Sequence, residues 1–230
     1  MKYPPGIGDD LTHPIHFPSL GLIETLAPLG PVPGRHDLLA HQALDVFAVW
    51  QAWEKESGRK QDIPYWATVW PAATLAAKYL HGSSVTVDGK TVLDLGCGGG
   101  IAGIAALKAG AVSVIANDTD PVALAMAERN AAANGLCLRV ESGNLLDAPP
   151  RREFEVILVA DLFYDRTSAR KMLAWLESAR ESGSKVFIAD ASRPFSPKTG
   201  VRILAEEILA TDPDLEGSRE RTVRFLAFRP

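Results

Sequence analysis

The sequence predicts an α/β fold, in which a doubly wound, mostly parallel seven-stranded sheet ends in an antiparallel C-terminal strand pair. From residue 91 onward, short aliphatic runs alternate with segments of helical periodicity, which is the pattern of successive strand and helix units. The first run breaks into a turn with four glycines within five residues, and residues 222–228 alternate as a half-buried strand does. We expect residues 1–63 to form an N-terminal helical extension and residues 64–230 a single domain around the sheet.

The composition is that of a globular protein with one substantial core. Its 230 residues are 47% hydrophobic and 23% charged. The net charge of -4 argues against a nucleic-acid partner, because nucleic-acid surfaces are usually basic. No apolar run approaches the roughly 20 residues of a membrane span, and the N-terminus does not resemble a signal peptide. Cys97 and Cys137 give no sign of pairing, so a cytoplasmic location away from membranes is expected.

The N-terminal part carries weaker signals than the rest. Prolines and glycines interrupt residues 1–34, which we expect to be irregular. Asp37 is expected to cap a helix near residues 37–56. His13 and His16 lie three residues apart, but no acidic or cysteine ligand is close by, so no metal site is predicted.

The glycine-rich turn follows the first aliphatic run, and its glycines fit two different motifs. Counted as Gly98-x-Gly100-x-x-Gly103, the spacing is that of the dinucleotide fingerprint, in which a pyrophosphate lies on the helix N-terminus. Counted as Asp94-x-Gly96-x-Gly98-x-Gly100, an acidic residue inside the strand precedes three alternate glycines. This second pattern resembles the signature of class I S-adenosylmethionine (AdoMet) methyltransferases.

Charge favours the second motif. Asp94 would meet a pyrophosphate with like charge, whereas AdoMet carries no phosphate and its amino group and sulfonium are cationic. The frame that starts at Gly98 also begins three residues after Leu95, the last aliphatic residue of the strand, instead of directly at its end. We therefore expect AdoMet, and its product S-adenosylhomocysteine (SAH), to bind at Asp94, Gly96, Cys97, Gly98 and Gly100.

Two more polar side chains are expected to complete the cofactor site. Asp118 ends the second predicted strand, 22 residues after Gly96, near the offset at which a carboxylate receives both ribose hydroxyls. Asp120 precedes Pro121 and is instead expected to cap the next helix. Asn144 follows the third predicted strand, where its carbonyl oxygen would accept from the exocyclic amine of adenine. Related enzymes often have aspartate at this place, and an amide keeps the acceptor.

A fourth predicted strand, residues 155–160, brings further polar and aromatic side chains to the same edge of the sheet. It is apolar enough to be buried on both faces of a parallel sheet, and ligands bind outside the carboxyl ends of such strands. We expect the chemistry here, with Asp161 and Tyr164 as the catalytic residues. A helix cap is the alternative role for Asp161, but Asp165 is better placed for it.

Aromatic residues gather just before the glycine turn. Tyr65, Trp66 and Trp70 precede a predicted helix that begins at Pro71. Such a cluster is either core or a wall that covers a cationic methyl donor or a lysine stem, because aromatic faces attract cations. In the second interpretation, Trp70 contacts the cofactor, and Trp66 lines the substrate channel together with Phe163.

Three motifs together give a narrower resemblance. They are Pro64-Tyr-Trp-Ala with Val69-Trp-Pro-Ala, Ala116-Asn-Asp-x-Asp-Pro121 and Asp161-Leu-Phe-Tyr-Asp165. The set resembles the seven-strand protein-lysine methyltransferases, and among them the bacterial form of the electron transfer flavoprotein β-subunit lysine methyltransferase family. The resemblance covers about residues 64–194 and implies a Rossmann-like methyltransferase fold. It also implies transfer of a methyl group from AdoMet to a lysine Nε of a protein, the flavoprotein β subunit.

The Asp161 motif differs from that of adenine and glutamine methyltransferases. Those enzymes carry Asn-Pro-Pro-Tyr at this place, which holds a planar amino group, whereas an acidic Asp161 suits a cationic amine. Two other function classes remain open. One is a methyltransferase for a small amine, such as a nicotinamide-like ring, or for another protein such as a ribosomal one. The other is a non-catalytic AdoMet-binding module, against which the intact Asp94, Asp118 and Asp161 set argues.

Overall fold

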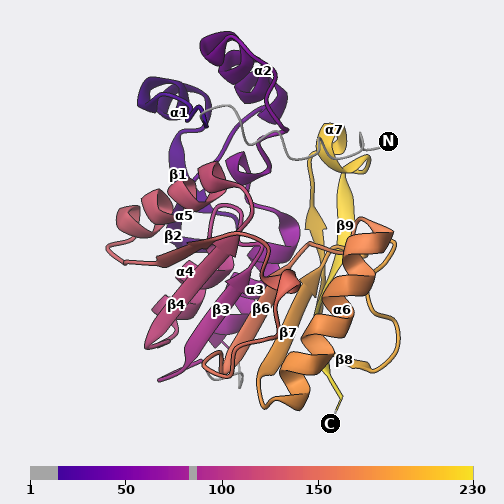
Figure 1. Ribbon diagram of the computed structural model, residues 1–230. Coiled ribbons are helices and arrows are strands. Elements are labelled where there is room, and N and C mark those ends of the chain that lie inside the picture. Colours follow the sequence, from indigo (N-terminus) through magenta and orange to yellow (C-terminus); the bar gives the residue numbers. More distant parts are fainter. Residues whose placement is uncertain (1–14, 83–86, 230) are drawn as a thin grey trace.

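The computed structural model describes residues 15–82 and 87–229, so His13 lies outside the described residues. A seven-stranded sheet forms the middle layer of the molecule (Figure 1). In sheet order the strands are β5 (Arg139–Ser142), β4 (Ser113–Asp118), β3 (Thr91–Leu95), β6 (Val156–Ala160), β7 (Lys185–Asp190), β9 (Glu220–Phe228) and β8 (Val201–Ala210). β9 is antiparallel to β7 and β8, and the other neighbouring strands are parallel. The predicted fold class is confirmed.

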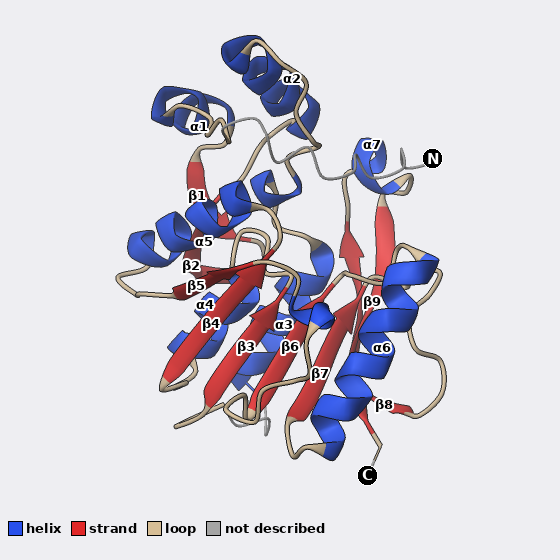
Figure 2. Cartoon of the chain, viewed as in Figure 1, coloured by secondary structure: helices blue, strands red, loops and turns tan. Residues whose placement is uncertain are grey.

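Helices cover both faces of the sheet (Figure 2). The helices of one face are α3 (Pro71–Gly82), α4 (Ile101–Lys108) and α5 (Pro121–Ala133), and the helix of the other face is α6 (Arg166–Glu181). In β6, Val156 and Leu158 enter the first core while Ile157 and Val159 enter the second. Burial on both faces explains why this strand is continuously apolar.

The strand order reverses at β3. From β3 the chain moves outward through β4 to β5, and then returns to the other side of β3 as β6 and continues to β7. Asp94 of β3 and Leu158 of β6 are register partners, so the two strands end side by side. Ligands of open α/β sheets bind outside the carboxyl ends of the strands at such a reversal.

The N-terminal part differs from the sequence prediction. Helix α1 (Leu20–Leu26) and a hairpin of β1 (Leu29–Val32) and β2 (Arg35–His41) occupy much of a stretch that was expected to be irregular or helical. The helix expected near residues 37–56 is α2 (Val46–Ser57), so its predicted beginning was wrong. Its N-cap is Asp45, whose side chain accepts from the N–H groups of the second and third helical residues.

In the middle of β2, at residues 37–40, more exposed and buried positions alternate. Leu38 and Ala40 are buried in the core that α3 and α4 share, whereas Asp37 is exposed. A two-residue period suits a strand and not a helix. Asp37 does not cap a helix: its carboxylate accepts hydrogen bonds from the Arg35 guanidinium, which holds the pKa of Asp37 well below its usual range.

The chain between the last two strands carries a short helix, α7 (Pro213–Glu216). Helices α1, α2 and α7 all lie at the end of the sheet to which the parallel strands point (Figure 1). Residues 202–210, whose sequence mixes helix and strand signals, form β8, the edge strand of the sheet. No helix among the described residues is long and apolar enough to cross a bilayer.

Candidate active site

The turn after β3 uses backbone angles that favour glycine. Gly96, Gly98 and Gly100 have φ angles of +65°, +51° and +77°. A Cβ on Gly100 would lie 2.8 Å from the Cβ of Ala127 in α5, so the turn packs directly against that helix. A Cβ on Gly98 would meet nothing within 4 Å. The main chain at Gly98 is therefore open to a ligand.

Asp94 is buried at the end of β3, beneath the first turn of α4. It is 1% exposed, and its Oδ2 accepts a hydrogen bond from the N–H of Gly103 at 2.8 Å. Burial raises the pKa of Asp94 to about 7; the Gly103 hydrogen bond opposes this shift, and the negative charge of Asp118 adds to it. A cation placed nearby would favour the ionised carboxylate.

Asp118 ends β4 and holds the glycine turn from the other side. Its Oδ2 accepts from the N–H of Gly98 at 2.9 Å, and its Oδ1 accepts from the N–H of Asp120 at 3.0 Å. A carboxylate has about four acceptor positions, so Asp118 keeps capacity for hydroxyl donors. Asp120 caps α5, as predicted, by accepting from the N–H of Val122.

Cys97 contributes its backbone to the turn. Its N–H donates to the carbonyl of Asn117 at 2.9 Å, which joins the turn to β4. Burial raises the pKa of the Cys97 thiol well above its usual value, and the charges of Asp94 and Asp118 add to this. The thiol is consequently neutral and unreactive at physiological pH.

Asn144 follows β5 and is exposed. Its side-chain oxygen accepts from the N–H of Leu146 at 3.2 Å and caps the short 3₁₀ helix η2 (Leu145–Asp147). Its amide nitrogen donates to Asp147 at 3.3 Å. The oxygen retains a second lone pair, so the cap leaves room for the adenine contact predicted from the sequence.

Two buried asparagines that the sequence analysis did not identify support this end of the site. The amide of Asn117 donates to the carbonyls of Glu141 and Gly143, which fixes the loop after β5 against β4. The amide of Asn130, on α5, donates to the carbonyl of Gly99 at 2.9 Å. Both side chains bond to backbone far away in the sequence, so no local pattern predicts these contacts, although Asn117 lies inside the motif at residues 116–121.

Asp161 is the first residue after β6 and has a φ angle of +64°, which is uncommon for a residue with a side chain. It is 7% exposed, and its N–H donates to the carbonyl of Ala189 in β7 at 2.9 Å. The next residue, Leu162, contacts the glycine turn: a Cβ on Gly96 would lie 2.4 Å from its Cδ1. The loop after β6 and the turn after β3 are therefore in direct contact.

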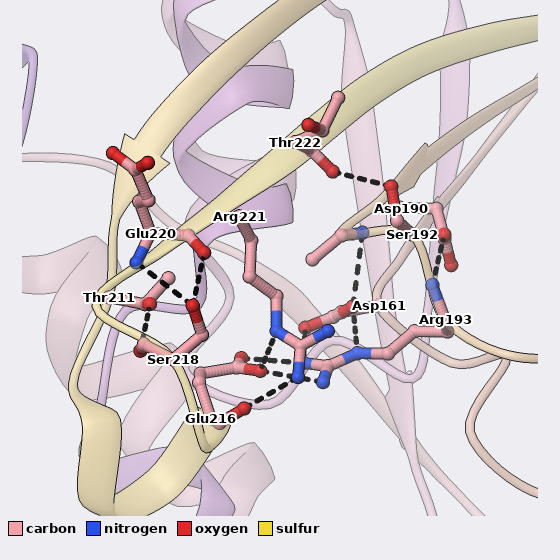
Figure 3. Close-up of polar contacts among 11 residues, drawn as sticks. Asp161, Asp190, Ser192, Arg193, Thr211, Glu216, Ser218, Glu220, Arg221 and Thr222 are labelled. Carbon is pink, nitrogen blue, oxygen red and sulfur yellow. Dashed lines mark hydrogen bonds and ion pairs between the residues drawn. The ribbon is translucent and has the colours of Figure 1, made fainter.

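Both oxygens of Asp161 accept hydrogen bonds from Arg193, in the loop after β7 (Figure 3). Arg193 Nε lies 2.7 Å from Oδ1 and Nη2 lies 2.5 Å from Oδ2. The same guanidinium donates to both oxygens of Glu216, at the end of α7, at 2.7 and 2.6 Å. Glu216 also forms an ion pair with Arg221 of β9. Two positive and two negative charges thus join two loops, a helix and a strand; we call these four residues the acceptor-end network.

The sequence analysis missed Arg193 and Glu216. A signal existed for Arg193: it follows β7, the neighbour of β6, so its loop had to lie beside Asp161. Asp190, at the end of β7, accepts from the N–H of Arg193 at 2.8 Å, and burial raises the pKa of Asp190 to about 6. Glu216 lies in the connection between the last two strands, where no local pattern indicates a role.

The aromatic residues divide into two groups. Trp66 is 1% exposed and packs edge-on against Trp53, and Phe163 is fully buried under α6. Neither ring lines an open channel, so the predicted channel role of these two residues is not supported and both belong to the core. Trp70 is partly exposed, and the guanidinium carbon of Arg193 lies 5.9 Å from its ring centroid. Tyr164 is 47% exposed, on the loop that begins with Asp161.

Replacing Trp66 with alanine is expected to lower the free energy of unfolding by roughly 3–5 kcal/mol, the usual cost of removing a buried aromatic ring. Trp70→Ala is the matched control and should cost clearly less, because its ring is partly exposed. Urea unfolding of both variants measures the difference. Equal costs would contradict the assignment of Trp66 to the core.

Comparison with known proteins gives a match over this part of the chain. The family model for "Ribosomal protein L11 methyltransferase (PrmA)" matches residues 74–165, which include the glycine turn and the Asp161 loop. The sheet order, the turn at Asp94–Gly100 and this match support the class predicted from the sequence, the class I AdoMet-dependent methyltransferases.

Individual relatives include lysine and ribosomal protein methyltransferases. The "Electron transfer flavoprotein beta subunit lysine methyltransferase" of Mus musculus is 37% identical and that of Homo sapiens 33% identical, each over 144 residues and 62% of this chain. These matches cover 56% and 55% of the relatives, so the chain spans about half the length of the curated proteins it matches. The "Ribosomal protein L11 methyltransferase" of Haemophilus ducreyi is 41% identical over 88 residues, which are 38% of this chain and 29% of that protein.

Solved structures support the fold. A protein of Pyrococcus horikoshii, provisionally described as an RNA methyltransferase, aligns with a TM-score of 0.52 at 21% identity over 69% of this chain and 84% of that one. A provisionally described methyltransferase complexed with SAH aligns with a TM-score of 0.50 at 14% identity over 69% of this chain and 50% of that one. At such identities the likeness concerns the fold alone.

Proposed function

We propose that this protein transfers a methyl group from AdoMet to the Nε of a lysine in the electron transfer flavoprotein β subunit. The observation that carries the proposal is the direct contact between the glycine turn, with its buried Asp94, and the acidic and aromatic loop that begins at Asp161. The similarity to flavoprotein lysine methyltransferases over 62% of the chain supports the choice of acceptor.

In this proposal AdoMet binds outside the carboxyl ends of β3, β4 and β5. Asp94 favours the cationic end of the molecule, Asp118 receives the ribose hydroxyls, and Asn144 accepts from the adenine amine. The open main chain at Gly98 lets the ligand approach the turn, and Trp70 offers an aromatic face at the opposite end of the site. When bound, AdoMet supplies an electrophilic methyl group on a sulfonium.

The acceptor amine must lose a proton before it can attack. At pH 7 an unperturbed lysine pays about 3.4 pH units, or ~4.6 kcal/mol, for this. Burial of the amine beside a sulfonium disfavours the ammonium form and lowers that cost. Asp161 orients the amine and takes up its proton, while Tyr164 contacts the lysine stem. The sulfur–methyl bond breaks as the nitrogen–methyl bond forms, and SAH is left.

A second candidate acceptor is ribosomal protein L11, because the L11 methyltransferase model matches the region that holds both halves of the site.

The test is incubation of the purified protein with methyl-labelled AdoMet and, separately, the flavoprotein β subunit, L11 and a lysate of the parent cells. We expect labelled lysine in the flavoprotein β subunit, located by mass spectrometry and suppressed by excess SAH. Label confined to L11, or to small metabolites, would replace the proposed acceptor. Binding of NAD(P) without uptake of SAH would overturn the cofactor assignment.

AdoMet binding is expected to strengthen between about pH 5 and 7 and to level off above pH 7. In the ligand-free protein the pKa of Asp94 is raised from 3.8 to about 7, so below pH 7 the cation must displace a proton from Asp94. The same shift affects stability. The contribution of Asp94 to the free energy of unfolding is largest below pH 3.8, where the carboxyl is protonated in both the folded and the unfolded state. This contribution is lost as the pH rises toward 7. Titration calorimetry in buffers of different ionisation enthalpy measures the released proton.

Asp94→Asn is the control for this pH dependence. Asp190 also titrates in this range, with a pKa near 6, but it lies at the end of β7 and is unchanged in the variant. Asp94→Asn should bind AdoMet more weakly at pH 8 and lose the slope below pH 7. A slope that survives in Asp94→Asn would show that another group is responsible.

A further inference from the structure

The backbone around Asp161 is held in an unusual conformation. Among the described residues, Asp161 and Ser192 are the non-glycine residues with a positive φ, at +64° and +57°. They follow the adjacent strands β6 and β7. Ser192 Oγ donates to the carbonyl of Thr222 at 2.7 Å, and the N–H of Ala191 donates to Asp161 Oδ1 at 3.4 Å (Figure 3). Such conformations persist where the surroundings over-determine them, and they are concentrated at functional sites.

Arg193 is fixed from several directions between these two loops. Its guanidinium makes paired hydrogen bonds to Asp161 and to Glu216, its backbone N–H donates to Asp190, and it faces the ring of Trp70. The side chains of Arg193, Asp161 and Glu216 are 9%, 5% and 3% exposed. An arginine with two bidentate carboxylate partners and little exposed surface is a rigid part of the site and not a mobile side chain that an incoming amine displaces.

The geometry also leaves Asp161 able to bind an amine. A carboxylate offers about four acceptor positions. Arg193 occupies two of them, and the N–H of Ala191 occupies a third at the longer distance of 3.4 Å. One position therefore remains for an amine N–H, and the plane of the carboxylate is set by the guanidinium fork.

From these contacts we infer that Arg193 is a positioning residue for methyl transfer: it fixes the Asp161 carboxylate toward the acceptor amine and links the C-terminal hairpin to the acceptor loop through Glu216. The inference rests on the proposed function, in which Asp161 handles the amine. The inference does not extend to Arg221, the second arginine of the acceptor-end network. Arg221 is 28% exposed, and within the network it contacts the carboxylate and the carbonyl of Glu216. Arg221 is therefore the matched control.

The test compares Arg193→Lys with Arg221→Lys. Lysine keeps the positive charge but replaces the planar fork with a single point charge, so it cannot orient a carboxylate in the same way. We expect Arg193→Lys to bind SAH like the wild type, to keep its KM for the methyl acceptor, and to lose about tenfold to a hundredfold in kcat. Arg221→Lys should lose clearly less kcat than Arg193→Lys, because the Arg221 guanidinium contacts Glu216. If Arg193 only stabilised the fold through its charge, Arg193→Lys would keep that charge and its activity. A kcat within about twofold of the wild type therefore overturns the inference. A raised kcat overturns it as well, because Arg193 would then be a competitor of the amine.

A second pair of variants covers the case in which Arg193→Lys does not fold. The double variant Arg193→Gln with Glu216→Gln removes one positive and one negative charge, so the network stays neutral, and Glu216→Gln alone is its control. The double variant should lose kcat relative to Glu216→Gln, and equal kcat values would overturn the inference.

A crystal structure of Arg193→Lys, or of the double variant, with SAH supplies a readout that does not depend on the acceptor. We expect the Asp161 carboxylate to leave its wild-type orientation there and to keep it in Arg221→Lys. An unmoved carboxylate overturns the inference. If the proposed function is wrong, the wild type itself methylates no lysine of the flavoprotein β subunit. That outcome is distinct from failure of the inference on Arg193.

Discussion

Gly100→Ala is expected to cost about 2–5 kcal/mol of stability, the sum of roughly 1–2 for a left-handed non-glycine residue and 1–3 for overpacking. Gly100 has a φ of +77°, and its new Cβ would lie 2.8 Å from the Cβ and 3.1 Å from the Cα of Ala127. A helix backbone cannot move aside as a flexible side chain does. The start of α4 must therefore shift, and SAH affinity should fall by at least about tenfold, or 1.4 kcal/mol.

Gly58→Ala is the control for the backbone angle alone. Gly58 ends α2 with a φ of +68°, and a Cβ there would meet nothing within 4 Å. This variant should lose only the cost of the left-handed conformation and bind SAH normally. Urea unfolding and calorimetry with SAH measure both quantities. The explanation of the turn fails if Gly100→Ala is as stable as Gly58→Ala and binds SAH equally well.

Asp161→Asn is expected to lower kcat by about 10²–10⁴-fold while SAH affinity stays unchanged, because the acceptor amine loses its charged partner and its proton acceptor. The variant should also be less stable, since removal of one partner of a buried ion pair costs about 3–5 kcal/mol. Activity must for this reason be measured where SAH binding shows that the protein is folded.

Asp165→Asn is the matched control in the same loop. Asp165 caps α6 by accepting from the N–H of Ser168 at 2.8 Å, and asparagine caps a helix about as well as aspartate. The control should therefore keep both stability and kcat. Near-wild-type turnover of folded Asp161→Asn would remove Asp161 from the chemistry.

The sheet and its helices could be predicted because their signals are local. An aliphatic run followed by a cap, as in β4 with Asp120 and Pro121, marks the end of one element and the start of the next. The β1–β2 hairpin could not be predicted in this way. Leu38 and Ala40 are buried by packing against the core of α3 and α4. The N–H of His41 donates to the side-chain oxygen of Asn130 at 2.8 Å, 89 residues away.

The residues of the candidate site also divide into those with a local sequence signal and those fixed by distant contacts. The positions of Asp94, Asp118 and Asp161 could be predicted because each lies at the carboxyl end of a parallel strand. Arg193 bonds to Asp161 across 32 residues, and Glu216 bonds to Arg193 across 23, so both depend on the order of strands in space. Trp66 and Trp70 have similar sequence surroundings, and only packing shows that the first is buried and the second partly exposed.

The place of β9 between β7 and β8 has a consequence for protein synthesis. As the chain leaves the ribosome, residues 91–147 emerge well before Glu216 and Arg221. The nascent chain can therefore complete the half that is proposed to hold the methyl donor while Arg193 still lacks the carboxylate of α7. Under the proposed function, transfer of the methyl group to a protein lysine therefore requires that β9 has been released and inserted between β7 and β8.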